Sequence, residues 1–169
     1  MRTLAVAVFC LAGCTPPGAL KPAAPVRLDV VQFRPDVRWL IQPADGSPRL
    51  ARFTLPRAED DTRDGVLTVR TAGGTIDANI RRWQQRFVQA PQTTRDVIDA
   101  PYGPVVWVRL DGTWLHKARA MVPGGELLPD STLLGGITRV PDGLLFFYAI
   151  GPHRTMTKWQ IALRTALGE

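Results

Sequence analysis

The sequence predicts an α+β fold in which a mostly antiparallel sheet is covered by two amphipathic helices. Short segments with alternating apolar and polar side chains recur along the chain, and turn residues separate most neighbouring pairs. Two other segments, 76–87 and 156–167, place their apolar residues on one helical face. Because hairpins make antiparallel pairs, the apolar surface of the resulting sheet needs the helices as its cover.

The first half of the chain contains three or four predicted strands. Segment 27–33 is the first, and 37–41 continues it or forms an additional strand. Segment 49–55 alternates apolar and polar side chains, as expected of a half-buried strand. A polar, acidic segment ending in Asp-Gly separates it from a strand at 66–71. We expect the last two strands to pair as a hairpin with a longish loop.

A helix is predicted to follow, with Thr75 as its N-cap and Asp77 in the first turn, where the helix dipole favours an acid. One face collects four apolar residues at spacings of four, three and four: Ile76, Ile80, Trp83 and Phe87. The polar residues are expected to point mostly elsewhere: Asn79, Arg81, Arg82, Gln85 and Arg86. The helix is expected to end before Pro91.

Segments 95–100 and 105–110 are the next predicted strands. Asp111-Gly112 is expected to turn the second of them into a strand at 113–116. Segment 118–131, which contains Pro123, Gly124-Gly125 and Pro129, is predicted to be an exposed loop.

Two further strands, at 132–140 and 144–150, are predicted to form a tight hairpin around Pro141-Asp142-Gly143. Gly151-Pro152 is expected to end the second of them. A C-terminal amphipathic helix then packs on the sheet through five apolar residues: Met156, Trp159, Leu163, Ala166 and Leu167.

The N-terminal segment predicts where the protein is located in the cell and which residue anchors it to a membrane. Arg2 provides a positive charge, residues 3–11 are almost unbroken apolar, and Leu11-Ala12-Gly13-Cys14 resembles the lipobox of a bacterial lipoprotein. The apolar run is shorter than the roughly 20 residues that a membrane-spanning helix needs. We therefore interpret 1–13 as a signal peptide and Cys14 as the lipidated first residue of the mature protein. An ordinary secretory signal, which has a similar apolar region, is the alternative.

Residues 14–25 form a Pro/Ala-rich segment that predicts an extended tether, and 26–169 is expected to be a single domain. Thr15, rather than Asp, follows the lipidated cysteine. By resemblance to Gram-negative sorting rules, this favours the periplasmic face of the outer membrane over the inner membrane. Cys10 is removed with the signal, so the mature domain has no thiol for a disulfide, a zinc site or nucleophilic catalysis.

The layout of the domain resembles that of bacterial envelope lipoproteins and, more distantly, the PsbP-like α/β sandwich, named for the extrinsic protein of photosystem II. The segments that carry the resemblance lie within about 49–167: Phe53-Thr54-Leu55-Pro56, Asn79-Ile80-Arg81-Arg82-Trp83 with Phe87, Leu134-Gly135-Gly136-Ile137, Phe146-Phe147-Tyr148 and Gly151-Pro152. Members of that fold family generally act as accessory or binding proteins. The resemblance therefore implies such a role and carries over no catalytic residue.

The formal net charge is +6, and it is carried almost entirely by arginine, because the chain has only three lysines: Lys21, Lys117 and Lys158. The arginines are scattered among acids, with no run of like charge beyond Arg81-Arg82. The clustered aromatic and basic residues that bind nucleic acid are absent. The pattern predicts a mildly basic, solvated surface and no nucleic-acid partner.

No catalytic, cofactor-binding or metal site is predicted. His116 and His153 lack the spaced partners of a metal site. Glu59-Asp60-Asp61 with Asp64 offers oxygen ligands for Ca²⁺ but lacks the calcium-loop spacing, so a solvated loop is the favoured interpretation. Gly73-Gly74-Thr75 lacks a phosphate-loop pattern and is interpreted as a turn.

Two of the five tryptophans are candidates for contact with a partner. Trp39 and Trp114 lie beside charged or turn residues, and a partly exposed tryptophan often anchors a partner. Packing in the core or at its rim is the alternative for both.

These features favour a lipid-anchored envelope protein that acts as a non-catalytic accessory or binding module for an envelope protein. One alternative is a carrier that shelters a small apolar or amphiphilic ligand in a cavity lined by residues such as Phe87, Trp107 and Phe147. Another is an envelope hydrolase. It would require His116 or His153 to face a cleft with a carboxylate or hydroxyl within hydrogen-bond reach.

Overall fold

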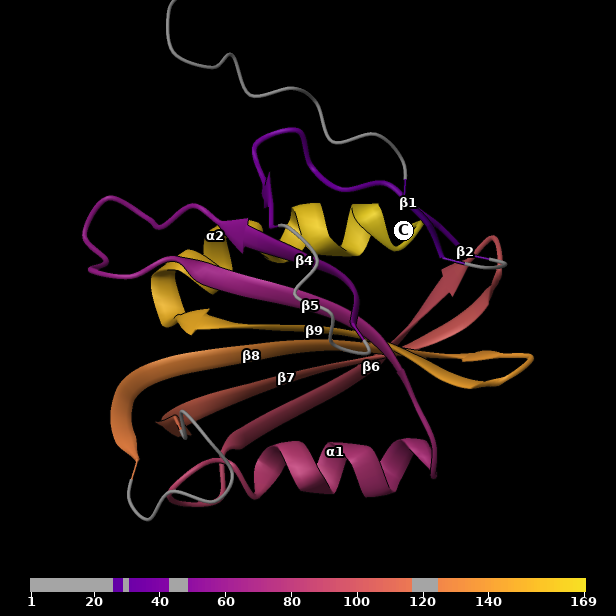
Figure 1. Ribbon diagram of the computed structural model, residues 1–169. Helices are drawn as coiled ribbons and strands as arrows, with labels where there is room; N and C mark the ends of the chain where they lie inside the picture. The colour runs from indigo at the N-terminus through magenta and orange to yellow at the C-terminus, as the bar shows by residue number, and fades with distance from the viewer. Residues whose placement is uncertain (1–25, 29–30, 43–48, 117–124) are drawn as a thin grey trace, which may run out of the picture.

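The computed structural model describes residues 26–28, 31–42, 49–116 and 125–169. In this part of the chain a seven-stranded sheet lies between two helices, one on each face (Figure 1). The strand order is β3-β4-β5-β9-β8-β7-β6, and every neighbouring pair is antiparallel. The predicted α+β fold, with a mostly antiparallel sheet and two helices, is therefore confirmed.

The large sheet comprises β3 (Leu40–Ile41), β4 (Arg49–Leu55), β5 (Gly65–Ala72), β6 (Gln92–Ala100), β7 (Gly103–His116), β8 (Glu126–Val140) and β9 (Gly143–Pro152). A separate two-stranded sheet comprises β1 (Val26–Leu28) and β2 (Val31–Phe33). The helices are α1 (Ile76–Gln84) and α2 (His153–Ala166).

The alternation of side chains along β9 shows how the sheet separates two cores. Leu145, Phe147 and Ala149 belong to the core under α2, whereas Leu144 and Phe146 belong to the core under α1. All five are almost completely buried. Both faces of β9 are therefore apolar, as expected of a strand at the centre of a sheet that is covered on both sides.

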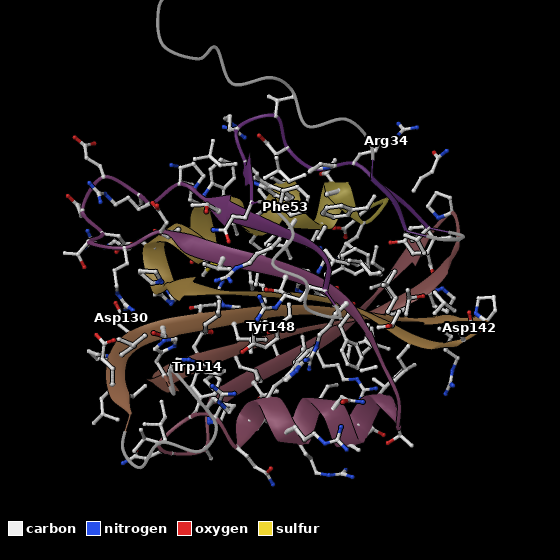
Figure 2. All side chains as sticks on the ribbon, viewed as in Figure 1. Arg34, Phe53, Trp114, Asp130, Asp142 and Tyr148 are labelled. Carbon is white, nitrogen blue, oxygen red and sulfur yellow. The ribbon has the colours of Figure 1, made fainter. Side chains whose placement is uncertain are left out.

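The two layers can be followed in Figure 2, where Phe53 lies on the α2 side of the sheet and Trp114 and Tyr148 lie on the α1 side. The core under α2 also receives Phe33 from β2 and Trp39 from the segment that precedes β3. The N-terminal part of the domain thus packs over the same face as α2.

Helix α1 begins as predicted. The hydroxyl of Thr75 accepts a hydrogen bond from the Ala78 N–H at 3.2 Å, and Asp77 lies in the first turn. The helix ends at Gln84, so Phe87 lies beyond it and forms an isolated bridge with Trp114. The expectation that Asn79 points outward is wrong. Its buried amide group donates to the carbonyls of Gly73 and Thr75, which anchors the start of the helix.

Helix α2 presents its predicted face to the sheet, because Met156, Trp159, Leu163 and Ala166 are all buried. Its N-cap position is Pro152, which offers no side-chain acceptor. The acceptor comes instead from the loop between β4 and β5. Asp61 Oδ2 accepts from the Thr155 N–H at 2.7 Å and from the Thr155 hydroxyl at 2.5 Å.

Replacing Asp61 with alanine is expected to lower the free energy of unfolding by about 1–2 kcal/mol, because α2 loses its capping acceptor. Chemical denaturation of the full chain measures the effect. Asp60→Ala is the matched control. Its carboxylate pairs with Arg154 in an exposed salt bridge, which contributes about 0–1 kcal/mol. Equal losses in the two variants would contradict the capping role.

Three strand predictions are corrected. Segment 27–33 forms two short strands that pair with each other, Val26 opposite Phe33. Asp111-Gly112 does not turn the chain, because β8 pairs with both residues and β7 continues through them. Residues 126–131 belong to β8 and not to a loop. Pro129 and Asp130 are accommodated at an irregularity of the β7–β8 ladder, where Asp130 has a φ of 48°.

The predicted lipidation site Cys14, the signal peptide and the tether lie outside the described residues. Among the helices that are described, none is long and apolar enough to cross a membrane.

Candidate binding site

A groove of about 960 Å³ opens on the α1 face of the sheet. It exists because α1 covers only part of that face. The fully buried sheet residues of the core under α1 come from β7, β8 and β9, whereas β5 contributes only the half-buried Ala72, at its end. Beyond α1, the same face of β4 and β5 carries polar side chains, among them Arg52, Thr68 and Arg70, and these line the groove.

Positive charge gathers in this groove. Six arginines line it: Arg49, Arg52, Arg63, Arg70, Arg82 and Arg86. In the described part of the chain, the acids that line the groove are Asp64 and Glu126. The arginines are scattered along the sequence, as stated above, but the fold brings six of the described ones to one groove. Positions that are far apart in the sequence are brought together by the pairing of β4 with β5 and by the place of α1.

Strand periodicity explains why these arginines face the groove. Phe53 on β4 and Leu67 and Val69 on β5 point into the core under α2, so the alternate positions Arg52 and Arg70 point to the other face. In the pairing of β4 with β5, Arg49 lies opposite Arg70, and Arg52 lies opposite Thr68. The sheet therefore presents cationic side chains as cross-strand and diagonal neighbours.

The opposite wall of the groove comes from α1 and the turn after it. Arg82 lies in the last turn of α1 and Arg86 in the turn after the helix, and both side chains line the groove. Arg82 Nη1 donates to Asn79 Oδ1 at 2.9 Å. The Arg86 guanidinium lies over the Trp114 ring, 4.8 Å from its centroid, which is a cation–π contact.

Among the described residues, three of the groove arginines lack an acidic partner. Within the described part of the chain, Arg52, Arg70 and Arg86 form no salt bridge. Arg52 Nε is buried and has no hydrogen-bond acceptor. A buried donor that lacks an acceptor is costly, and an anionic ligand would supply one.

Aromatic side chains line the groove between the two walls. Tyr148 packs edge-on against Trp83, with ring centroids 5.3 Å apart, and lies 6.3 Å from Trp114. Burial raises the pKa of the Tyr148 phenol, and the positive charges of Arg86 and Arg70 oppose that rise. The phenol is therefore protonated at neutral pH, and it interacts electrostatically with one arginine from each wall.

The predicted partner contacts Trp39 and Trp114 are corrected, because both side chains are only 3% exposed. Trp39 packs among Phe33, Phe53 and Trp159 in the core under α2. Trp114 contacts Phe87 and is covered by Arg86. Each position is adjacent to polar residues in sequence, but its own side chain points inward, so neither offers an exposed indole to a partner.

The two histidines have different environments. His116, at the end of β7, is exposed and lines one end of the groove. His153, the first residue of α2, lies beside β7 and β8: its Nδ1 is 3.2 Å from Asp111 Oδ1 and 3.0 Å from Thr132 Oγ1. A carboxylate and a hydroxyl are thus both within reach of His153, as the hydrolase hypothesis requires.

The geometry at His153 does not match a nucleophilic relay. Such a relay places the acid and the nucleophile on different ring nitrogens, whereas Asp111 and Thr132 both contact Nδ1. Thr132 is fully buried, and its hydroxyl donates to Asp111 at 2.5 Å. Arg109 Nε donates to the other Asp111 oxygen at 2.8 Å. The cluster therefore joins the start of α2 to β7 and β8.

Asp111 makes the stability of this cluster dependent on pH. Burial opposes its ionisation, but the hydrogen bonds from Arg109 and Thr132 and the charges of Arg109 and His153 outweigh burial and hold the pKa of Asp111 below its usual value. A carboxylate with a lowered pKa contributes stability above its unfolded-state pKa of about 3.9, and that contribution is lost as the pH falls through the folded-state pKa.

Asp111→Asn is expected to destabilise the protein by about 1–3 kcal/mol at pH 7, because Arg109 loses its carboxylate partner. The difference from the unchanged protein should narrow below about pH 4. Urea denaturation at a series of pH values measures both effects. Asp142→Asn, at the exposed tip of the β8–β9 hairpin, is the control. A difference that stays constant down to pH 2 would contradict the role of the carboxylate.

The acidic loop takes part in structural contacts. Asp61 caps α2, Asp60 pairs with Arg154, and Asp64 accepts a hydrogen bond from the Arg57 N–H at 2.9 Å. Among the described residues, no group of three or more histidine, cysteine, aspartate or glutamate side chains could hold a metal ion.

The cavity expected of an apolar carrier is also corrected. Phe87 packs in the core under α1, whereas Trp107 and Phe147 pack in the core under α2. Because the sheet separates them, these three residues cannot line one cavity.

The groove arginines were not predicted from the sequence to form a common site. Their signal is present in the sequence, since Arg52 and Arg70 occupy the outward positions of two strands that were predicted to pair, and Arg82 and Arg86 are spaced by four. A scan against protein-family models and a search of curated proteins found no match to this chain. The candidate site is therefore defined by its geometry and charge.

Proposed function

We propose that this chain is a lipid-anchored protein of the bacterial cell envelope and that it acts as a non-catalytic accessory module. Cys14 carries the lipid and holds the domain at the periplasmic face of the outer membrane. The domain binds an envelope protein through the arginine-lined groove. The groove is the observation that carries this proposal, because it gathers six arginines and an aromatic floor around about 960 Å³ of open space.

The likeness to the PsbP-like sandwich belongs to the same proposal. An antiparallel sheet between two helices is compatible with that architecture. An accessory or binding role for the groove agrees with what members of that fold family generally do. A carrier of a purely apolar ligand is disfavoured, because the groove walls are charged.

The anchor is tested by growing cells that express the full chain with an alkyne-bearing fatty acid, which labels lipidated proteins. We expect the unchanged chain to be labelled and to fractionate with the outer membrane, and Cys14→Ser to lose both properties. Cys10→Ser is the matched control and should keep them, because this cysteine lies within the signal. Equal labelling of all three chains, or of none, would contradict lipidation at Cys14.

The groove is tested by photocrosslinking in intact cells. p-Benzoylphenylalanine in place of Gln85, which lines the groove, should capture a protein partner. The same group in place of Arg81, an exposed residue of α1 that does not line the groove, should not. If Gln85 yields no adduct, or the same adducts as Arg81, the groove is not the binding surface.

A further inference from the structure

We infer that the groove binds an extended acidic segment of its protein partner, with carboxylates at alternate positions. This inference rests on the proposed function and names the chemistry of the ligand. Among the described lining residues, Arg52, Arg70 and Arg86 form no salt bridge, which favours an anionic occupant, and the arrangement of these arginines distinguishes between kinds of anion.

The spacing of the sheet arginines fits an extended chain. Arg52 lies opposite Thr68, two residues before Arg70, so the two arginines are displaced along the strand by one same-face repeat. That repeat is about 6.8 Å, and it is also the spacing of alternate side chains in an extended peptide. Alternate carboxylates of a peptide that runs along β5 would therefore meet successive arginines.

The wall formed by α1 and the turn after it also carries two arginines. Arg82 lies in the last turn of α1 and Arg86 in the turn that follows the helix, and both line the groove. The charges of Arg86 on this wall and of Arg70 on the sheet both act on the Tyr148 phenol, and all three residues line the groove. A carboxylate above Tyr148 would lie near both guanidinium groups, and the phenol could donate a hydrogen bond to it.

A single phosphate or another compact anion fits less well. Compact anions are usually bound where several donors converge, often with backbone N–H groups at a helix N-terminus or in a nest. Here the strands are paired on both sides: β5 with β4 and β9. The cations are spread along the groove from Arg63, before β5, to Arg70 near its end. Planar guanidinium groups in such a row suit successive carboxylates.

The test is equilibrium binding of a fluorescent ten-residue peptide of alternating Glu and Thr to the purified full chain, followed by anisotropy. We expect binding that weakens as salt is added, and at least about tenfold weaker binding of the Gln–Thr peptide of equal length. Arg70→Gln and Arg86→Gln should each weaken binding of the Glu–Thr peptide about tenfold. Arg81→Gln and Arg139→Gln remove an exposed arginine outside the groove and should change it less than about twofold.

Circular dichroism of each variant confirms that it is folded, so that lost binding reports on the groove. Equal affinity for the Glu and Gln peptides, or equal loss in the groove and control variants, would overturn the inference. Stronger binding of a ten-nucleotide oligothymidylate or of inorganic pyrophosphate than of the Glu–Thr peptide would also overturn it, in favour of a phosphate ligand.

The inference and the proposed function can fail separately. A partner captured at Gln85 without binding of the acidic peptide would leave the groove as the binding surface and overturn the ligand class. Acidic-peptide binding by a chain that is not labelled at Cys14 would support the ligand class and overturn the anchor.

Discussion

Replacing Gly135 with alanine is expected to lower the free energy of unfolding by about 3 kcal/mol. A Cβ at this position of β8 would lie 2.2 Å from Trp83 Cζ3, far inside van der Waals contact, and 3.0 Å from Val108 Cγ1. Trp83 cannot simply rotate away, because it packs edge-on against Phe146 and Tyr148. Relief of the clash therefore requires α1 to move off the sheet, which exposes the core beneath it.

Gly136→Ala is the matched control, because its side chain would point to the other face of the same strand. There the nearest atom is Leu167 Cδ1 at 3.0 Å, the end of a flexible side chain that can move. Chemical denaturation should therefore show a much smaller loss for Gly136→Ala. Trp83→Leu in the Gly135→Ala background should recover part of the lost stability. Equal losses in the two glycine variants would contradict the close contact between α1 and β8.

Reversing two charges of the groove is expected to reverse its ligand preference. A chain that carries both Arg70→Glu and Arg86→Glu should bind the Glu–Thr peptide at least about 100-fold more weakly, and a Lys–Thr peptide of equal length more strongly, than the unchanged chain. The reason is that these residues come from opposite walls of the groove and that their charges act on the same phenol, that of Tyr148. Fluorescence anisotropy with both peptides measures the reversal.

The control for this reversal is the pair Arg81→Glu and Arg139→Glu, which makes the same change in net charge outside the groove. It should leave the preference for the Glu–Thr peptide in place. The control pair should keep its stability within about 0.5 kcal/mol, because both residues are exposed. The groove pair should lose about 1 kcal/mol, because Arg86 no longer lies over the Trp114 ring. A reversal in both double variants would mean that net charge, and not the groove, selects the peptide.

The local structure could largely be predicted from the sequence, because hairpins and amphipathic helices have short-range signals. Thr75 as N-cap, the β4–β5 hairpin and the buried face of α2 all follow from residues within one or two turns. The pairing of β5 with β9 could not be predicted in this way. Its register places Val66 opposite Ile150, and no local pattern links such distant segments. That pairing decides which strands α1 leaves uncovered.

The candidate site could not be predicted either, because it depends on contacts between distant segments of the chain. Alternation predicts that Arg52 and Arg70 leave the core under α2, but it does not say what lies on the other face. Asp111-Gly112 and Trp114 show the opposite error. A turn and an exposed indole were expected from neighbouring residues, whereas pairing with β8 and contact with Phe87 determine the outcome. Long-range contacts override local preference at each of these positions.

The side-chain N–H signals of arginine in nuclear magnetic resonance report whether the groove arginines bind an acidic chain. Titration of the full chain with the Glu–Thr peptide should shift the Nε–H signals of Arg52, Arg70 and Arg86. The largest change is expected at Arg52, whose buried Nε–H lacks an acceptor. The signals of Arg81 and Arg139 should stay in place. Shifts confined to those two residues, or no shift at Arg52 while the peptide binds, would show that the groove arginines are not the binding site.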